Sequence, residues 1–462
     1  MKVKRMQRND SQLALEIAQR VKERGGRAMY VGGLVRDAVR GDESGSKDID
    51  IEVYGLTPDE LRETLAEVGE VYVKGASFGV FGLRHSEIDI AMPRQEHCIG
   101  RGHKDFEVFV DPFLSFEKAA VRRDFTINAM MQDVLTGEII DPFGGREDLA
   151  RGVLRHVSPV TFPEDALRVF RCAQFASRFG YAVHPETMEL MRGIDVTHLS
   201  HERVMSELEK ALMKAERPSL FFQVLRDCGQ LSAFFPESER LIGVKQNPQF
   251  HPEGDVWNHT LMVIDQAAAL RSQTKFPLYY MLSALMHDLG KITSSQVQED
   301  GRITSYMHPE AGVPLAQAQL KRLTNDRKMT DYVLNMVLMH MRPCTLANGN
   351  SRLKKSRAMF DESVCPEDLI LLAMADAFGC GVNRHFGAWP YLKERLEDYR
   401  EIMRRPMIGG QDLIAAGYRP GTQFREMIDR AKQLHFSGLD CERVLQQLRA
   451  EYPLHAEKTT EN

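Results

Sequence analysis

Lys47-Asp48-Ile49-Asp50-Ile51-Glu52-Val53 is the stretch that decides the fold of this 462-residue chain. Polar and apolar residues alternate along it, so the acidic side chains share one face of a strand and the aliphatic side chains share the other. The aliphatic face can pack on a helix layer while the acidic face lies in a cleft. Two neighbouring carboxylates repel each other unless a cation lies between them, and a divalent metal is the natural occupant. We therefore expect Asp48 and Asp50 to bind metal in an α+β domain.

A glycine pair lies just upstream, in Val31-Gly32-Gly33-Leu34-Val35-Arg36-Asp37. Two glycines at a turn from a strand into a helix can serve backbone shape alone. In the functional interpretation, the amide N–H groups of Gly32 and Gly33 cradle phosphates at a helix N-terminus. Arg36 then adds charge-assisted hydrogen bonds to the same phosphates, and Asp37 orients Arg36 or caps the helix.

A second alternating stretch, Glu87-Ile88-Asp89-Ile90-Ala91, offers a further carboxylate. We expect Asp89 to reach the same site from a neighbouring strand. Three carboxylates with two metals and a triphosphate make a site for phosphoryl transfer, in which one metal activates a hydroxyl and the other stabilises departing pyrophosphate. A solvated polar strand face remains the alternative from these residues alone.

The composition bounds the class of protein. A hydrophobic content of 43% indicates a globular chain, and its length suggests about three domains. The formal net charge of -5 leaves room for RNA binding through local basic patches. The 7 cysteines are scattered without a Cys-x-x-Cys pair, which is typical of reduced thiols in a cytoplasm. No apolar run approaches the ~20 residues of a membrane span, so we expect a cytoplasmic protein without a membrane partner.

Strand signals nearly vanish after about residue 155, and amphipathic helices then dominate to the end of the chain. The predicted fold is therefore a mixed-sheet α+β head followed by an all-helical neck and body. We predict a head over 1–155, a helical neck over 156–237, a histidine-rich domain over 238–395 and a C-terminal helical tail over 396–462.

The glycine–arginine motif followed by Asp48-Ile49-Asp50 resembles the opening motif of class II tRNA nucleotidyltransferases and bacterial poly(A) polymerases. Weaker likeness continues through Ser200 to Arg203 and Gly417 to Gly421, so that the resemblance covers nearly the whole chain. Three segments between these extend it in the family's order: Arg122-Arg123-Asp124-Phe125-Thr126-Ile127-Asn128-Ala129, Asp141-Pro142-Phe143-Gly144-Gly145 and Glu164-Asp165-Ala166-Leu167-Arg168-Val169-Phe170-Arg171.

The resemblance implies a role for each matching residue. The catalytic carboxylates would be Asp48 and Asp50, which bind Mg²⁺, together with Asp89. The residues that hold the nucleotide's phosphates and ribose, or read its base, would be Gly32, Gly33, Arg36, Arg123, Asp124, Asp165, Arg168 and Arg171.

The base-reading residues also make physical sense. Asp165, Arg168 and Arg171 are spaced by three, so we expect them to be neighbours on one helix face. A carboxylate beside a forked donor can meet the Watson–Crick edge of C or A, but not that of G or U. An exposed ladder of salt bridges is the alternative for this helix taken alone. The family often has another Arg one turn later, where this chain has Gln174, which makes this face less cationic.

A second constellation lies in the histidine-rich domain. Val256-Trp257-Asn258-His259-Thr260 and Leu285-Met286-His287-Asp288-Leu289-Gly290-Lys291 resemble the two signatures of the HD phosphohydrolase superfamily, with Asp376 as the distant carboxylate. Adjacent His and Asp project about 100° apart on a helix, so they can flank one ion. Imidazole with carboxylate suits a transition metal or Mg²⁺, and His308 and His340 are candidates for a second ion. For a lone histidine, a packed core role is the alternative.

These expectations combine into one function. The chain would add C and A to the tRNA 3′ end from CTP and ATP without a template, and its HD domain would act as a phosphohydrolase or phosphodiesterase with a divalent transition metal. An A-only or C-only tRNA nucleotidyltransferase, or a poly(A) polymerase, is the closest alternative. An HD phosphohydrolase with a non-catalytic RNA-binding head is a further one. The oligomeric state and the identity of the HD metal are not decided by these residues.

Overall fold

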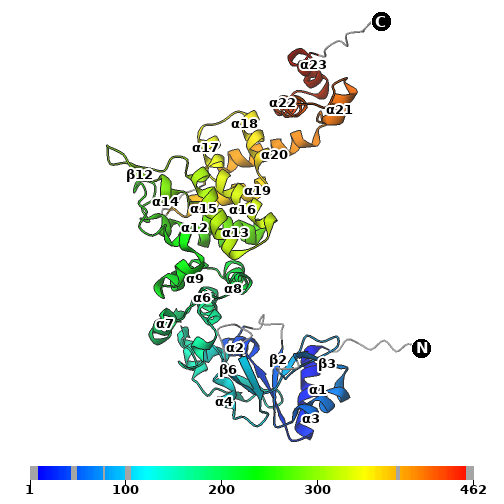
Figure 1. Ribbon diagram of the computed structural model, residues 1–462, viewed down its shortest axis with the longest axis vertical. Helices are drawn as coiled ribbons and strands as arrows, with labels where there is room; N and C mark the ends of the chain where they lie inside the picture. Colours follow the sequence, from blue (N-terminus) through cyan, green and yellow to red (C-terminus); the bar gives the residue numbers. More distant parts are fainter. Residues whose placement is uncertain (1–8, 43–48, 76–78, 99–105, 381–385, 454–462) are drawn as a thin grey trace, which may run out of the picture. The chain divides into compact units, whose positions relative to one another are not determined.

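The chain forms two compact units, Met1–Phe234 and Phe235–Asn462 (Figure 1). The finer division at residues 155, 237 and 395 stays a prediction. In the part of the chain that the structure describes, no helix has both the length and the hydropathy needed to cross a membrane. The computed structural model describes residues 9–42, 49–75, 79–98, 106–380 and 386–453.

A 7-stranded mixed sheet forms the centre of the first unit, in the order β3-β4-β5-β2-β1-β8-β9. Strand β2 pairs antiparallel with β1 and parallel with β5, and this parallel register puts Asp50 directly opposite Asp89. The mixed sheet confirms the α+β head. Its strands are β1 (Arg27–Val31), β2 (Asp50–Tyr54), β3 (Val71–Gly75), β4 (Val80–Leu83), β5 (Asp89–Ala91), β8 (Met131–Asp133) and β9 (Ile139–Ile140).

Helices α1 (Asp10–Glu23) and α3 (Pro58–Val68) cover one face of this sheet (Figure 1). Their apolar stripes form one buried cluster with Ile51 and Val53, so the aliphatic face of the alternating stretch is buried as expected. The stretch Thr57-Pro58-Asp59-Glu60 predicts a helix start, and Thr57 and Glu60 make this cap at the start of α3, where each side chain accepts a hydrogen bond from the other's backbone N–H.

The sequence predicts Asp10 or Ser11 as the N-cap of helix α1, and the structure differs. Asn9, rather than Asp10 or Ser11, is the N-cap residue, and its side chain accepts a hydrogen bond from the Ser11 N–H. The helix therefore begins at Asp10. Asn, Asp and Ser are about equally good N-cap residues, so residue type alone does not select one of these three neighbours. The N-cap is Asn9 because its backbone is extended and the residues after it are helical.

Short elements and helices complete the first unit. Phe170 of α6 packs edge-on against Phe234 of α10, with ring centroids 5.4 Å apart. The polar, glycine-containing composition of 96–105 predicts a loop, but residues 96–98 are in strand β6 and the remainder lies outside the described residues. The remaining elements are α2 (Gly33–Arg40), β6 (Arg94–Cys98), β7 (Phe106–Val110), α4 (Phe116–Ala120), η2 (Thr126–Asn128), α5 (Gly145–Arg151), β10 (Val153–Leu154), η3 (Phe162–Glu164), α6 (Leu167–Phe179), β11 (Ala182–Val183), α7 (Pro185–Arg192), α8 (His201–Lys214), α9 (Ser219–Asp227) and α10 (Leu231–Phe234).

The second unit is built from helices, as predicted, apart from a short hairpin of β12 (Gln296–Val297) and β13 (Ile303–Thr304). Gly301 lies between these strands with φ of +79°, a conformation that favours glycine and lets the chain reverse. The helices are α11 (Pro236–Glu239), α12 (Val256–Leu270), η4 (Arg271–Gln273), α13 (Pro277–Met286), α14 (Lys291–Ser294), α15 (His308–Leu323), α16 (Arg327–Met339), α17 (Arg342–Asn348), α18 (Leu353–Glu362), α19 (Pro366–Phe378), α20 (Trp389–Arg404), α21 (Gly410–Ala415), α22 (Phe424–Phe436) and α23 (Cys441–Glu451).

A buried carboxylate fixes the start of α13, the helix that leads into His287. Asp368 of α19 accepts hydrogen bonds from the backbone N–H groups of Lys275 and Phe276 at 3.0 and 3.3 Å. It also accepts the Tyr332 hydroxyl of α16 at 2.6 Å. The three helices that surround the histidine motif are thereby joined at one end, which positions the motif at the other end of α13.

Candidate functional site

A cavity of about 760 Å³ opens in the first unit between the sheet and helices α6 and α8. Asp50 lines it, whereas Asp89, among the described residues, is not part of its lining. Asp48 lies outside the described residues. All the residues expected to bind the nucleotide line this cavity: Gly32, Gly33, Arg36, Arg123, Asp124, Asp165, Arg168 and Arg171.

The glycine turn approaches both a carboxylate and an arginine. Gly32 has φ of 72° and precedes α2, whose first N–H groups have no partner within the helix. A Cβ at Gly32 would lie 3.7 Å from Asp50 Oδ2 and 3.9 Å from Arg123 Nη1. The positive φ strains any other residue here. The turn thus brings backbone donors, an exposed carboxylate and a guanidinium to one place, which suits a metal-bound phosphate.

Arg36 is held within the protein. Its Nε donates to Asp37 Oδ1 at 2.8 Å, and its Nη1 donates to Asn128 Oδ1 at 2.8 Å. The guanidinium lies over the Phe179 ring, 4.8 Å from the centroid. Burial lowers the pKa of Arg36, although Asp37 opposes this change. Of the two roles expected for Asp37, orienting Arg36 is the one present.

Glu52 is a functional candidate that sequence reasoning did not single out. Its side chain is 1% exposed, and its Oε1 lies 2.9 Å from Arg122 Nη2. Its Oε2 lies 3.7 Å from Arg123 Nη2 and accepts the Tyr54 hydroxyl at 2.6 Å. Burial alone would raise the pKa of Glu52, but Arg123, Arg122 and Tyr54 lower it overall, so the carboxylate stays ionised. The alternation that places Glu52 beside Asp50, together with the paired arginines, was the available signal.

Asp124 connects the sheet to helix α6. Its Oδ2 accepts from two nitrogens of Arg171, Nε at 2.8 Å and Nη2 at 2.6 Å. Its Oδ1 accepts from Asn128 Nδ2 at 3.0 Å and from the Phe125 N–H at 2.8 Å. Burial would raise the pKa of Asp124, but Arg171 and these hydrogen bonds lower it overall. In this arrangement Asp124 fixes the position of Arg171.

Asp165 is not on the helix that carries its expected partners, which corrects the assumption of one helical face. It lies in extended backbone before α6, and its Oδ1 accepts the Leu167 N–H at 3.1 Å. This hydrogen bond explains why the helix starts later, because Asp favours the start of a helix over its interior. Asp165 also accepts Arg203 Nη2 at 3.0 Å. It still lines the same cavity as Arg168 and Arg171.

Arg168 donates to two backbone carbonyls, those of Thr161 and Arg122, each at 2.6 Å. Gln174, where the family often has Arg, is buried and lines the cavity. Its Nε2 makes no hydrogen bond within the described residues. Helix α8 adds a charged face at helical spacing that the sequence analysis did not assign to the site: Arg203, Glu207, Lys210 and Lys214.

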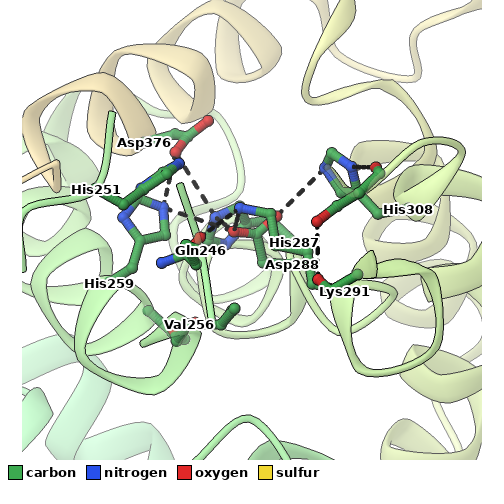
Figure 2. Close-up of polar contacts among 12 residues, drawn as sticks. Gln246, His251, Val256, His259, His287, Asp288, Lys291, His308 and Asp376 are labelled. Atoms are coloured by element: carbon green, nitrogen blue, oxygen red, sulfur yellow. Dashed lines mark hydrogen bonds and ion pairs between the residues drawn. The ribbon is translucent and has the colours of Figure 1, made fainter. Parts of the chain in front are cut away.

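The second unit brings all the predicted HD residues together (Figure 2). They form two neighbouring groups whose ligand atoms lie within 4.8 Å of one another: His259, His287 and Asp376 in one, and Asp288, His308 and His340 in the other. Asp288 belongs to the second group and also contacts both histidines of the first. Its Oδ2 is 3.6 Å from His259 Nε2 and 3.3 Å from His287 Nε2, while its Oδ1 is 3.4 Å from His308 Nε2.

The histidine hydrogen bonds fit a metal centre. The Nδ1 atoms of His287, His308 and His340 lie 2.7 to 2.8 Å from backbone carbonyls. A carbonyl only accepts, so each Nδ1 carries the proton and each Nε2 presents a lone pair. The Nε2 atoms of His308 and His340 are 3.2 Å apart. Two lone pairs at that distance repel each other unless a cation lies beside them, so these residues fit divalent metal.

The charge states of His340 and Asp376 agree with this arrangement. Burial, with His287 and His308 nearby, lowers the pKa of His340 to about 3, so its imidazole is neutral at physiological pH. Burial would raise the pKa of Asp376, but its hydrogen bond to His259, at 3.0 Å from Nε2, lowers it overall. A neutral imidazole and an ionised carboxylate are the forms that bind metal. Burial would lower the pKa of His259, but its hydrogen bonds to Asp376, Cys380 and Glu253 raise it overall, so a metal at Nε2 would displace a proton.

Two residues beside the ligands were not predicted. Lys291 Nζ lies 2.6 Å from Asp288 Oδ2 and donates to Gln246 Oε1 at 2.8 Å (Figure 2). Glu253 contacts both His259 and His251, a histidine that sequence reasoning left without a role. His385, also left without a role, lies outside the described residues.

Comparison with protein families divides the chain into three matches. The poly A polymerase head domain matches residues 28–155. A probable RNA and SrmB-binding site of polymerase A matches residues 180–242, and the HD domain matches residues 256–379. The head match contains the glycine turn and Asp50, and the HD match contains all six expected HD ligands; both domains are metal-dependent.

Curated relatives and solved structures agree with these matches. The multifunctional CCA protein of Nitrosococcus oceani is 43% identical over 418 residues, which cover 87% of this chain and 96% of that protein. That of Nitrosospira multiformis is 39% identical over 330 residues, covering 69% and 76%. A Bacillus stearothermophilus CCA-adding enzyme in complex with CTP shares the fold with a TM-score of 0.63 and 22% identity, covering 96% of this chain and 98% of its own. The Thermotoga maritima CCA-adding enzyme complexed with tRNA has a TM-score of 0.60 at 18% identity, with the same coverages. The chain therefore belongs to the family of tRNA nucleotidyltransferases and poly(A) polymerases that includes the multifunctional CCA proteins, and it carries their HD domain.

Proposed function

We propose that this chain adds C and A to the 3′ end of tRNA, taking them from CTP and ATP without a nucleic-acid template. The observation that carries the proposal is the cavity that joins the glycine turn and Asp50 to the arginines of the helical neck. Relatives named multifunctional CCA proteins, one of them 43% identical, support the same reaction. With no template strand in such a reaction, the base must be chosen by protein side chains.

Asp48, Asp50 and Asp89 are the catalytic carboxylates of this proposal. The register that places Asp50 opposite Asp89 on adjacent strands supports their shared role. Their oxygen donors suit Mg²⁺, which when bound lowers the pKa of the terminal ribose hydroxyl and neutralises charge on the phosphates. Asp89 forms an ion pair with Lys74. A metal would compete with Lys74 for Asp89, and a phosphate would compete with Asp89 for Lys74.

The nucleotide would lie along the cavity from phosphates to base. Gly32 and Gly33 offer backbone N–H groups to the triphosphate, with Arg36 and Arg123 supplying positive charge. Asp124 meets the ribose hydroxyls or acts through Arg171, which it holds. All of these residues line one cavity, which supports their assignment to nucleotide binding.

Base choice falls to Asp165, Arg168 and Arg171. An acceptor beside forked donors complements C and A and leaves G and U with unmatched groups, which costs binding free energy. The contact between Arg203 and Asp165 supports a carboxylate fixed in orientation before a base arrives. Side chains would thus perform the selection that a template performs in other polymerases.

The HD domain supplies a second activity, hydrolysis of phosphomonoesters, 2′-nucleotides or 2′,3′-cyclic phosphates. Its ligands are His259, His287, Asp288 and Asp376, with His308 and His340 for a second ion. The donor set favours a divalent transition metal, which when bound activates water for attack on phosphorus. The paired Nε2 atoms 3.2 Å apart support this site.

Single-turnover labelling tests the transfer reaction. Three tRNA transcripts, ending before CCA, after C-C and after CCA, are each incubated with Mg²⁺ and with CTP alone, ATP alone or both. Addition of C-C and then A, followed by arrest, is expected. Incorporation of ATP only onto the C-C transcript would indicate an A-adding enzyme, CTP alone a C-adding one, and unbounded A tails a poly(A) polymerase. No incorporation would overturn the proposal.

The HD activity has its own test. Hydrolysis of nucleoside 2′,3′-cyclic phosphate and of p-nitrophenyl phosphate is followed with the chelated protein and after adding back Ni²⁺, Co²⁺, Mn²⁺ or Mg²⁺. Activity restored by a transition metal is expected, and its absence with every ion would overturn the proposed HD reaction. We also place the protein in the cytoplasm, which its free described cysteines support.

A further inference from the structure

Two histidines share one buried carboxylate oxygen at the edge of the HD site. The side chain of Glu253 is 3% exposed, and its Oε1 lies 2.9 Å from His259 Nδ1 and 2.9 Å from His251 Nδ1. The two imidazole rings lie edge to face, with centroids 4.8 Å apart. Glu253 precedes α12 and reaches forward onto its first turns, where His259 is located.

His259 is oriented differently from the other histidines of the site. His287, His308 and His340 each use Nδ1 on the backbone carbonyl three residues earlier: Ala284, Ser305 and Val337. The corresponding carbonyl for His259 belongs to Val256, and it accepts the Thr260 hydroxyl at 2.8 Å. Where three ligands rely on the backbone, His259 relies on a carboxylate side chain.

The contact determines which nitrogen of His259 faces the site. An ionised carboxylate only accepts, so the proton of the contact is on Nδ1. Nε2 then points at the remaining ligands, 3.0 Å from Asp376 Oδ1 and 3.6 Å from Asp288 Oδ2 (Figure 2). An anionic acceptor also makes the imidazole a stronger donor to metal than a neutral carbonyl does.

We propose that Glu253 is the positioning residue of the HD metal centre: it holds His259 through Nδ1 and so directs Nε2 at the metal. This inference rests on the metal centre of the proposed function. His251, which is partly exposed, donates to the same oxygen and packs over the contact. It contributes no atom to the ligand group of His259, His287 and Asp376, but it forms a further candidate group with Glu253, His259 and Cys380, whose ligand atoms lie within 4.8 Å of one another.

The test measures metal affinity directly. The full chain carrying Asp50→Ala, which removes a head carboxylate, is titrated with Mn²⁺ alone by isothermal calorimetry. Glu253→Ala in this background is expected to weaken the affinity of the HD site by about 10- to 100-fold. Glu253→Gln keeps an oxygen that can accept from Nδ1, so a smaller loss is expected. His251→Asn and the exposed control Glu299→Ala are expected to bind like the parent.

The outcomes distinguish the positioning role of Glu253 from the proposed HD metal centre on which it rests. A parent that binds no Mn²⁺ at the HD site would overturn the metal centre and this inference with it. A parent that binds, with Glu253→Ala unchanged, would overturn the positioning role alone, as would a loss in His251→Asn equal to that in Glu253→Ala. Urea unfolding in EDTA reports the fold of each variant, and if Glu253→Ala is unfolded, Glu253→Gln decides by the same titration.

Discussion

The two sites solve different binding problems. The head site is an open cavity of about 760 Å³ whose charged side chains come from strands, from residues 122–124 and from helices α2, α6 and α8. In the HD site the histidines and Asp288 are almost entirely buried, and only Asp376 among the six ligands is appreciably exposed, at 21%. A cavity lined by arginines suits a large polyanion, whereas a compact cluster of imidazole and carboxylate suits a small cation.

The same contrast appears in how each site is kept in shape. In the head, cations would repel each other in the cavity, and buried carboxylates such as Glu52 and Asp124 hold them in place. In the HD site, lone pairs and carboxylates converge, and backbone carbonyls with Glu253 orient them. Each site therefore has some groups that face its ligand and other groups that hold those in place. The predictions below separate these two roles.

Removal of a catalytic carboxylate should have the largest effect. Asp50→Ala is expected to lower the rate of CTP and ATP addition on the order of 10³-fold or more, because several kcal/mol of metal-based stabilisation are lost. HD phosphohydrolase activity should remain, since Asp50 belongs to the other unit. Single-turnover labelling and phosphatase assays on one preparation measure both. The exposed Asp59→Ala is the control, and loss of both activities in Asp50→Ala would contradict two independent sites.

The reverse substitution is Asp288→Ala. Because Asp288 lies between both ligand groups, its loss should abolish HD hydrolysis and metal-dependent reactivation after chelation. Nucleotide addition with Mg²⁺ should stay close to that of the unmodified protein. The exposed Asp331→Ala is a matched control. An Asp288→Ala protein that still hydrolyses the substrate would remove this residue from the centre.

Glu52→Gln should have an intermediate effect, on nucleotide binding. Without its charge, Arg122 and Arg123 lose their common anion, so the KM for CTP and for ATP should rise together by about tenfold, that is by about 1.4 kcal/mol. The ratio of the two KM values should not change, since base selection lies elsewhere. Glu70→Gln, which removes only the exposed pair with Arg84, controls for charge. An unchanged KM in Glu52→Gln would mean that the arginines are positioned without it.

The smallest effect is expected for a carboxylate that serves structure alone. Burial would raise the pKa of Glu367, but Arg400 and Lys275 lower it to about 2. Because this pKa is below that of an unfolded glutamate, about 4.3, the stabilisation is present above that pH and is lost as the pH falls through about 2. Glu367→Gln should lower the free energy of unfolding at pH 7, and the gap should close between about pH 5 and pH 2.

Urea titrations in EDTA across this pH range measure that gap. Both activities should be unaffected at pH 7, because Glu367 contacts Lys275 and Arg400 rather than either site. A gap that stays constant down to pH 2 would show that the effect is not ionic. A loss of HD hydrolysis would show that this ion pair also shapes the metal site.

Periodicity predicted the elements near the sites because local geometry decides them. Alternation identified β2 and its buried face, and the Thr57 cap identified the start of α3. The helical arrangement of Asp165 was wrong, since a spacing of three is compatible with a helix but does not require one. Asp165 bonds the Leu167 N–H from outside the helix, as its short side chain allows.

The sequence by itself determined which chemical groups this protein has and their order along the chain. The glycine turn, the alternating carboxylates and the adjacent His287 and Asp288 are each local, so their spacing alone indicates their chemistry. Only the tertiary structure decided which distant groups meet. His259 and Asp376 are 117 residues apart, and Glu52 and Arg122 are 70 apart, yet each pair is in contact. Contacts of that kind depend on how helices and strands pack. The apolar pattern of one element shows that it has a buried face, but it does not show which element covers that face.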